Sequence, residues 1–139
     1  MPQYLVVANQ TLVSNELMER VWERLEEGDC SFHLVVPATR LRQAWTWTHG
    51  RAHAVASERL RAALDHFSAI GADATGEVGD ANPMAAISDC MLLTRFDAII
   101  LSTLPPGRSE WLKQDLPSRV ARAFGVPVSH VVAGPVPVA

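Results

Sequence analysis

Short apolar runs that alternate with longer segments of helical periodicity constrain this chain more than any other feature of its sequence. Runs of this kind are typical of strands buried on both faces of a parallel sheet. Strands joined by helices in this order form right-handed crossovers, and the helices then cover both faces of the sheet. We therefore predict an α/β fold with one parallel sheet, whose strands lie at Tyr4–Ala8, Phe32–Val36, Ala74–Val78, Asp97–Leu101 and Val128–Val132.

The segments between these strands carry start and stop signals of helices. Ser14 is a good N-cap for a first helix that stops at Gly28, and Asn82 followed by Pro83 predicts the start of a third helix. The strand before Asn82 is the most polar of the five, which suits the edge of a sheet. The remaining helices are expected at about His53–Ile70 and Leu116–Phe124, and the buried stripe of the third helix at Met84, Ile87 and Met91.

The length of 139 residues fits one domain with its own hydrophobic core. We expect a single domain over residues 1–139, with a core from about 3 to 132 and a loose tail at 133–139. The formal charge of −3 argues against nonspecific binding to nucleic acid. Because no apolar run approaches the roughly 20 residues that cross a bilayer, and the N-terminus lacks the pattern of a signal peptide, we expect a cytoplasmic protein.

The cysteines and two of the histidines give no metal motif. Cys30 and Cys90 are isolated in the sequence, with no CxxC and no neighbouring histidine, so both are expected to be reduced, buried, apolar side chains. His49 and His53 are four residues apart, a spacing that places two ligands on one helix face. Since His49 stands in an irregular segment, we favour a solvated pair over a zinc site.

Two tryptophans, Trp45 and Trp47, lie in the least regular part of the chain, between residues 38 and 50. Their indoles could stack on a base or line the mouth of a pocket. We favour the simpler interpretation, in which this loop folds its indoles over exposed core or over a partner.

Several short motifs stand in an order that resembles the universal stress protein family. They are the Val78-Gly79-Asp80 turn with Pro83 entering a helix, the Phe96-Asp97-Ala98-Ile99-Ile100 strand, and the Val120-Ala121-Arg122 to Pro127-Val128 pattern. The resemblance covers about residues 3 to 132. It implies a single-domain, three-layer α/β/α fold with the parallel sheet ordered 3-2-1-4-5. It also implies a homodimer formed largely through the last strand, around Val128, His130 and Val132.

Many members of that family bind ATP between strands one and four, where the strand order reverses. The resemblance places Asn9 where nucleotide-binding members carry an aspartate, and their Gly-x2-Gly-x9-Gly motif is lost here. Ser102 and Pro105 stand at the first two glycine positions, and Asp115 falls where a phosphate would meet a helix N-terminus. A carboxylate about 4 Å from a phosphate opposes binding by ~1 kcal/mol in water. We therefore expect no cofactor, although the alternative, ATP or another adenine nucleotide, stays open.

Two functional hypotheses follow. The first is a noncatalytic regulatory or interaction protein of the universal stress type, homodimeric and without an ATP site. The alternative is a protein that binds a small ligand or an adenine nucleotide or nucleoside in the cleft between strands one and four. An enzyme is the least favoured, because no nucleophile with a base, carboxylate pair or metal cluster can be assembled from the strand ends. The residues expected around a ligand are Asn9, Gln10, Val36, Ser102, Thr103, Leu104, Gly107 and Asp115.

Overall fold

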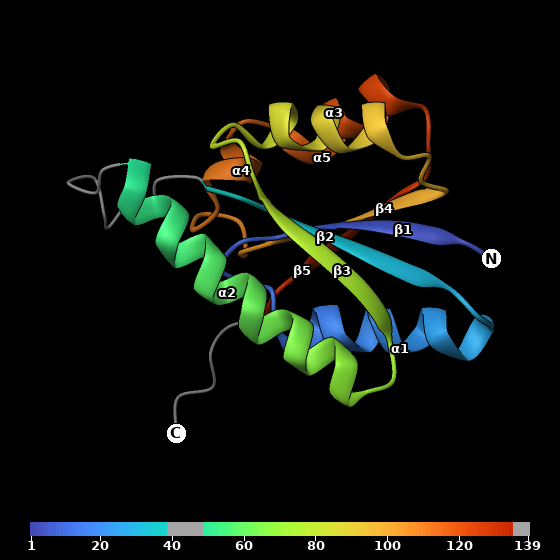
Figure 1. The fold of residues 1–139 in the computed structure, drawn as a ribbon. Helices are drawn as coiled ribbons and strands as arrows, with labels where there is room; N and C mark the ends of the chain where they lie inside the picture. The colour runs from blue at the N-terminus through green and yellow to red at the C-terminus, as the bar shows by residue number, and fades with distance from the viewer. Residues whose placement is uncertain (39–48, 135–139) are drawn as a thin grey trace.

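A computed structural model describes residues 1–38 and 49–134 of the chain. Its centre is a five-stranded, all-parallel sheet in the order β3-β2-β1-β4-β5, which confirms the predicted α/β fold and strand order (Figure 1). The order reverses between β1 and β4, because the chain first builds outward to β3 and then returns to the other side of β1. The strands are β1 (Gln3–Val7), β2 (Ser31–Pro37), β3 (Asp73–Gly79), β4 (Ala98–Thr103) and β5 (Val128–Val132).

Helices cover both faces of the sheet, as Figure 1 shows. On one face, α1 (Asn15–Glu27) and α2 (His49–Ala69) pack on a core cluster that includes Phe32, Leu34 and Phe67. On the other face, α3 (Pro83–Leu93), α4 (Glu110–Lys113) and α5 (Leu116–Phe124) pack on a second cluster that includes Leu5 and Ile99. Alternate residues of β1 and β4 point to opposite faces, which is why both strands read as continuous apolar runs.

The predicted N-caps of α1 and α3 and the predicted end of α1 are confirmed. The Ser14 hydroxyl accepts the backbone N–H of Leu17 at 3.2 Å, and α1 stops at Gly28. At the start of α3, the Asn82 side-chain oxygen accepts two backbone N–H groups, including that of Met84 at 2.9 Å. Each side chain satisfies donors that have no partner within the helix.

Three predicted details were wrong. Helix α2 starts at His49, four residues before the expected start, and the short helix α4 was not expected at all. Strand β4 begins at Ala98 and continues through Ser102 and Thr103, which had been placed in the loop after it. Both side chains are buried, and each hydroxyl group has a hydrogen-bond partner, so neither is buried without one. In α3 the predicted stripe of Met84, Ile87 and Met91 does pack on the core, with Ile87 fully buried, and Cys90 is buried beside it.

Ala133, which was expected in the loose tail, is buried, and its N–H donates to the Thr103 carbonyl at 2.9 Å; residues 135–139 lie outside the described residues. Trp45 and Trp47 lie outside the described residues. Among the helices of residues 1–38 and 49–134, none is both long enough and apolar enough to cross a membrane.

The edge strand β3 has one polar side that helices leave partly open. Thr75 and Glu77 are exposed on it, and they alternate with half-buried residues that face α2. Gly79 ends the strand where an added Cβ would lie 2.9 Å from the Cβ of Ala86 in α3. Because Gly79 has no side chain, α3 can pack closely against the end of β3, near Glu77.

Candidate functional site

The carboxyl ends of β1 and β2 are joined by the amide of Asn9, the first residue of the predicted site. This side chain is buried, with 7% of its surface exposed. Its Nδ2 donates to the Pro37 carbonyl at 2.8 Å, and its Oδ1 accepts a hydrogen bond from Nη1 of Arg59 in α2 at 2.5 Å. Both polar atoms of the amide are thus used to connect β1, β2 and α2.

Arg59 brings a positive charge to this end of the sheet. Burial lowers its pKa from the ordinary value, since a desolvated guanidinium is less favourable than a hydrated one. An arginine nevertheless stays protonated in a protein, so its charge must be stabilised by local acceptors. The amide oxygen of Asn9 is such an acceptor, and its contact with Arg59 is therefore a charge-assisted hydrogen bond.

The hydroxyl groups predicted to face a ligand are bonded to neighbouring side chains. Ser102 Oγ lies 2.6 Å from Thr11 Oγ1, and Thr103 Oγ1 lies 2.8 Å from Nε2 of His130 in β5. Ser102 and Thr103 are 1% and 2% exposed. Burial lowers the pKa of His130, which favours a neutral ring in this contact. The hydroxyl groups therefore tie β4 to the β1 loop and to β5.

The other predicted site residues are spread around this end of the sheet. Val36 is buried in the core beneath α1 and α2, Gln10 is exposed, and Leu104 is half-buried. Gly107 has a φ of 88°, in the left-handed region that glycine adopts readily. Asp115 is exposed directly before α5, as predicted, with a φ of 55° and no side-chain bond to the helix. The sequence thus placed Asp115 correctly relative to the helix.

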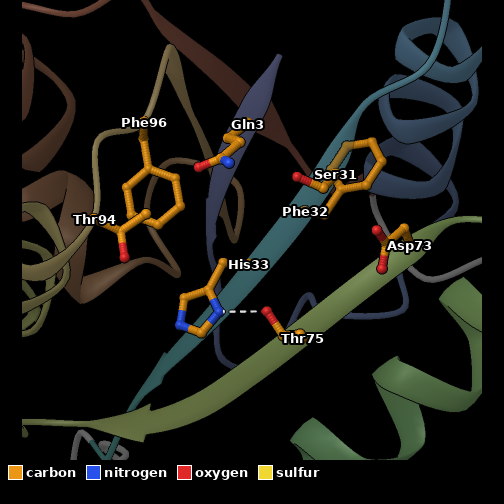
Figure 2. A pocket seen from close by; sticks show the side chains of 8 residues that line it. All are labelled: Gln3, Ser31, Phe32, His33, Asp73, Thr75, Thr94 and Phe96. Carbon is orange, nitrogen blue, oxygen red and sulfur yellow. Dashed lines mark hydrogen bonds between the residues drawn. The ribbon is translucent and has the colours of Figure 1, made fainter. Parts of the chain in front are cut away.

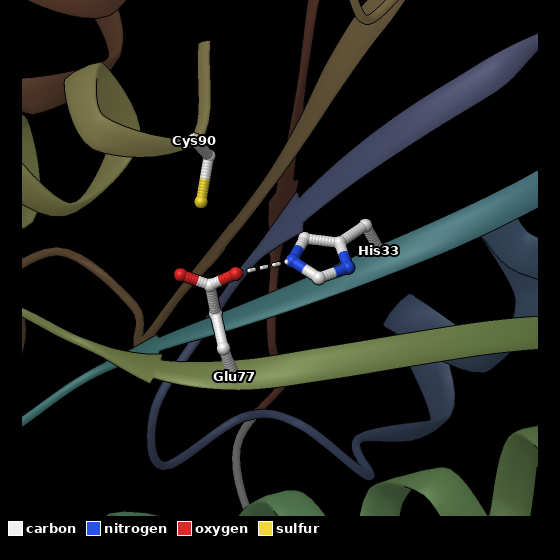
Figure 3. Close-up of side chains that lie close together, drawn as sticks. All are labelled: His33, Glu77 and Cys90. Carbon is white, nitrogen blue, oxygen red and sulfur yellow. Dashed lines mark hydrogen bonds and ion pairs between the residues drawn. The ribbon is translucent and has the colours of Figure 1, made fainter. Parts of the chain in front are cut away.

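A second group of polar side chains, which the sequence analysis missed, lies between β2, β3 and α3. The imidazole of His33 spans two side chains of β3, with Nδ1 at 2.7 Å from Thr75 Oγ1 and Nε2 at 2.8 Å from Glu77 Oε2. The thiol of Cys90 in α3 points toward the same carboxylate (Figure 3). One ligand atom from each of His33, Glu77 and Cys90 lies within 4.8 Å of the others, and we call these three residues the HEC cluster.

The thiol of the HEC cluster is held in its protonated form. Burial is the main cause, and the negative charge and hydrogen bond of Glu77 add to it, raising the pKa of Cys90 to about 12. A cysteine nucleophile needs a lowered pKa or a base in contact with the sulfur. In a catalytic cysteine–histidine pair the imidazole contacts the thiol directly. Here the carboxylate of Glu77 lies between the thiol and the imidazole (Figure 3). The cluster is thus unsuited to nucleophilic catalysis and retains three potential metal ligands.

A shallow pocket of about 250 Å³ opens beside His33, at the amino ends of the strands. It lies at the opposite end of the sheet from Asn9, since its walls include the first residues of β1, β2 and β3. The ring of Phe96 stacks on that of His33, with centroids 6.0 Å apart (Figure 2). The walls are formed by Gln3, Ser31, Phe32, His33, Asp73, Thr75, Thr94 and Phe96.

Comparison with known proteins does not assign the chain to a family. No protein-family model matches the sequence, and no curated protein matches it. The function must therefore be argued from the geometry of this chain.

Proposed function

We propose that the chain is a noncatalytic interaction protein of the universal stress type, which acts as a homodimer and does not take ATP in the cleft between β1 and β4. The observation that carries this proposal is the hydrogen bonding of Asn9, whose amide is used by Arg59 and Pro37. Ser102 is likewise bonded to Thr11. A nucleotide that used these same groups would compete with these contacts, and each buried polar group left without a partner costs about 1–3 kcal/mol.

The loop after β4 supports the same conclusion for the phosphates. Pro105 and Pro106 have no backbone N–H, and the N–H of Arg108 donates to the Pro105 carbonyl at 3.1 Å. A phosphate cradle is built from several N–H groups that point at the ligand. Asp115, at the N-terminus of α5, adds a negative charge that repels a phosphate.

Isothermal titration of the purified protein with ATP, ADP and adenosine, each with and without Mg²⁺, tests the absence of nucleotide binding. The expected result is no saturable heat at ligand concentrations up to about 1 mM, which corresponds to binding weaker than about −4 kcal/mol. Asn9→Asp restores the carboxylate that the resemblance places here, and this variant is expected to behave like the native protein because the loop donors remain absent. Micromolar binding by the native protein would refute the proposal.

The outer edge of β5, which pairs with no other strand of residues 1–38 and 49–134, supports the homodimer. Hydrogen bonds from Ile99 N–H to the Pro127 carbonyl and from Ala133 N–H to the Thr103 carbonyl show that odd-numbered residues of this segment bond to β4. Because peptide groups alternate along a strand, those of His130 and Val132 point to the outer edge. Val132 is also 40% exposed. Such an edge pairs readily with another strand, and a second copy of β5 would satisfy its donors and acceptors.

A further inference from the structure

The three side chains of the HEC cluster differ in chemistry, but each offers one atom that can bind a metal ion. A histidine nitrogen, a carboxylate oxygen and a thiol sulfur are the three side-chain donors that zinc uses in proteins. They come from β2, β3 and α3, and their ligand atoms lie within 4.8 Å of one another. We propose that His33, Glu77 and Cys90 bind one zinc ion, with water as the fourth ligand.

The ligand atoms lie near enough to close around one ion after local adjustment. Zinc bonds of about 2.0 Å to nitrogen or oxygen and about 2.3 Å to sulfur separate neighbouring ligand atoms by about 3.3–3.6 Å. The 2.8 Å contact between His33 Nε2 and Glu77 Oε2 must therefore widen by about half an ångström, and the sulfur of Cys90 must stay within reach. A separation at the 4.8 Å limit would have to shrink by roughly 1 Å, and rotations of the three side chains would bring the ligand atoms to these distances.

The surroundings of His33 suit a metal ligand. Thr75 Oγ1 lies 2.7 Å from Nδ1, so that Nε2 is directed at Glu77 and Cys90. Metal-binding histidines usually donate a hydrogen bond from the second ring nitrogen to such an acceptor, which fixes the tautomer. Phe96 stacks on the same ring, with the centroids 6.0 Å apart. The ring is thus already oriented by Thr75 and Phe96 before any ion arrives.

The charges and protons also balance. With a neutral imidazole, binding moves the ring proton from Nε2 to Nδ1 and releases the thiol proton of Cys90 to solvent. The two charges of zinc are then matched by the Glu77 carboxylate and the Cys90 thiolate, and the site is neutral. Neutrality matters because Cys90 is only 4% exposed. The side chains of His33 and Glu77 are 23% and 47% exposed, which leaves a path for the ion and for the water ligand.

The soft sulfur ligand decides which metal is bound. Magnesium and calcium prefer sites built from oxygen, whereas mixed nitrogen, oxygen and sulfur donors favour zinc and its neighbours in the first transition row. Cobalt(II) accepts the same geometry and absorbs light, so it reports whether sulfur is bound. This proposal does not depend on the absence of ATP binding or on the homodimer.

Direct binding measurements test the site. Reduced protein is freed of metal with a chelator, and its affinity for ZnCl₂ is measured by competition with a chromophoric chelator. One ion per chain is expected, and His33→Gln and Cys90→Ala should each weaken binding at least tenfold. Glu77→Gln should weaken it less than either. With cobalt, the native protein should show the near-ultraviolet charge-transfer band of a thiolate ligand, and Cys90→Ala should lose it.

Two matched variants control for general effects of substitution. Cys30→Ala removes the other buried cysteine, which lies in the core on the opposite face of the sheet, and His53→Gln removes an exposed histidine of α2. Both should bind zinc with the native affinity. Circular dichroism of every metal-free variant verifies its fold, and at one zinc concentration the melting temperature of the native protein should rise more than that of His33→Gln. Native protein without saturable binding, or Cys90→Ala with native affinity, would overturn the proposal.

Discussion

Replacing Asn9 by alanine should destabilise the protein far more than the loss of one polar side chain usually does. The substitution removes the bond to the Pro37 carbonyl, worth about 1 kcal/mol, and the charge-assisted bond from Arg59, worth about 1.5–3 kcal/mol. The expected loss of unfolding free energy is therefore about 2.5–4 kcal/mol. At roughly 3 °C per kcal/mol for a domain of this size, the melting temperature should fall by about 8–12 °C.

Equilibrium unfolding in urea measures this loss, and an unchanged slope against denaturant shows that the folded state is still compact. All samples must be compared at one protein concentration, because a dimer links stability to concentration. Gln10→Ala removes the neighbouring amide, which is exposed, and should cost less than about 0.5 kcal/mol.

A double-mutant cycle with Arg59→Met separates the two bonds of Asn9. We expect a coupling of about 1–2 kcal/mol between positions 9 and 59, because Asn9 Oδ1 accepts directly from the guanidinium. A cost of Asn9→Ala equal to that of Gln10→Ala, or a coupling near zero, would refute the view that Arg59 and Asn9 hold this end of the sheet together.

Three other substitutions test separate parts of the structure. Ser14→Ala removes the N-cap of α1 and should cost about 1 kcal/mol in urea unfolding, while Ser118→Ala at an exposed position of α5 should change stability by less than about 0.5 kcal/mol; equal effects would contradict the capping role. Gly79→Ala places a Cβ 2.9 Å from both the Ala86 Cβ and the Val35 Cγ2 and should destabilise by about 1–3 kcal/mol; native stability would contradict the close packing at Gly79. The pKa of Cys90, raised in the folded protein from 9.0 to about 12, adds stability that is complete below pH 9 and is lost as the pH rises toward 12. Metal-free native protein should thus lose unfolding free energy above pH 9 more steeply than Cys90→Ala, and identical slopes would contradict the raised pKa.

Elements with strong local signals could be predicted from the sequence. The N-caps at Ser14 and Asn82 and the stop at Gly28 depend on residues within one turn of the helix end, so their chemistry is visible in a short window. Helix α4 was missed because it has only four residues, so its hydrophobic period is too short to detect. Its signals were an N-cap at Ser109 and the buried Trp111 that follows it.

The candidate sites were harder to predict, because they depend on contacts between distant parts of the chain. The predicted strand ended at Leu101, before Ser102, but the hydroxyl of Thr11, 91 residues away in the sequence, satisfies the Ser102 hydroxyl inside the sheet. His33 and Glu77 are separated by 44 residues and meet only because β2 and β3 pair in parallel. Cys90 reaches them from a helix. A histidine within an apolar strand was the one visible sign of this site.

The molar mass in solution tests the central claim, a homodimer through the outer edge of β5. Light scattering of the native protein should give twice the chain mass of 15.2 kDa. Val132→Pro removes an outward N–H without touching the bonds to β4, and should give a monomer that keeps native circular dichroism. Val132→Thr keeps the N–H at the same position and should remain dimeric. A native protein of 15.2 kDa, or a folded Val132→Pro variant that stays dimeric, would contradict the claim.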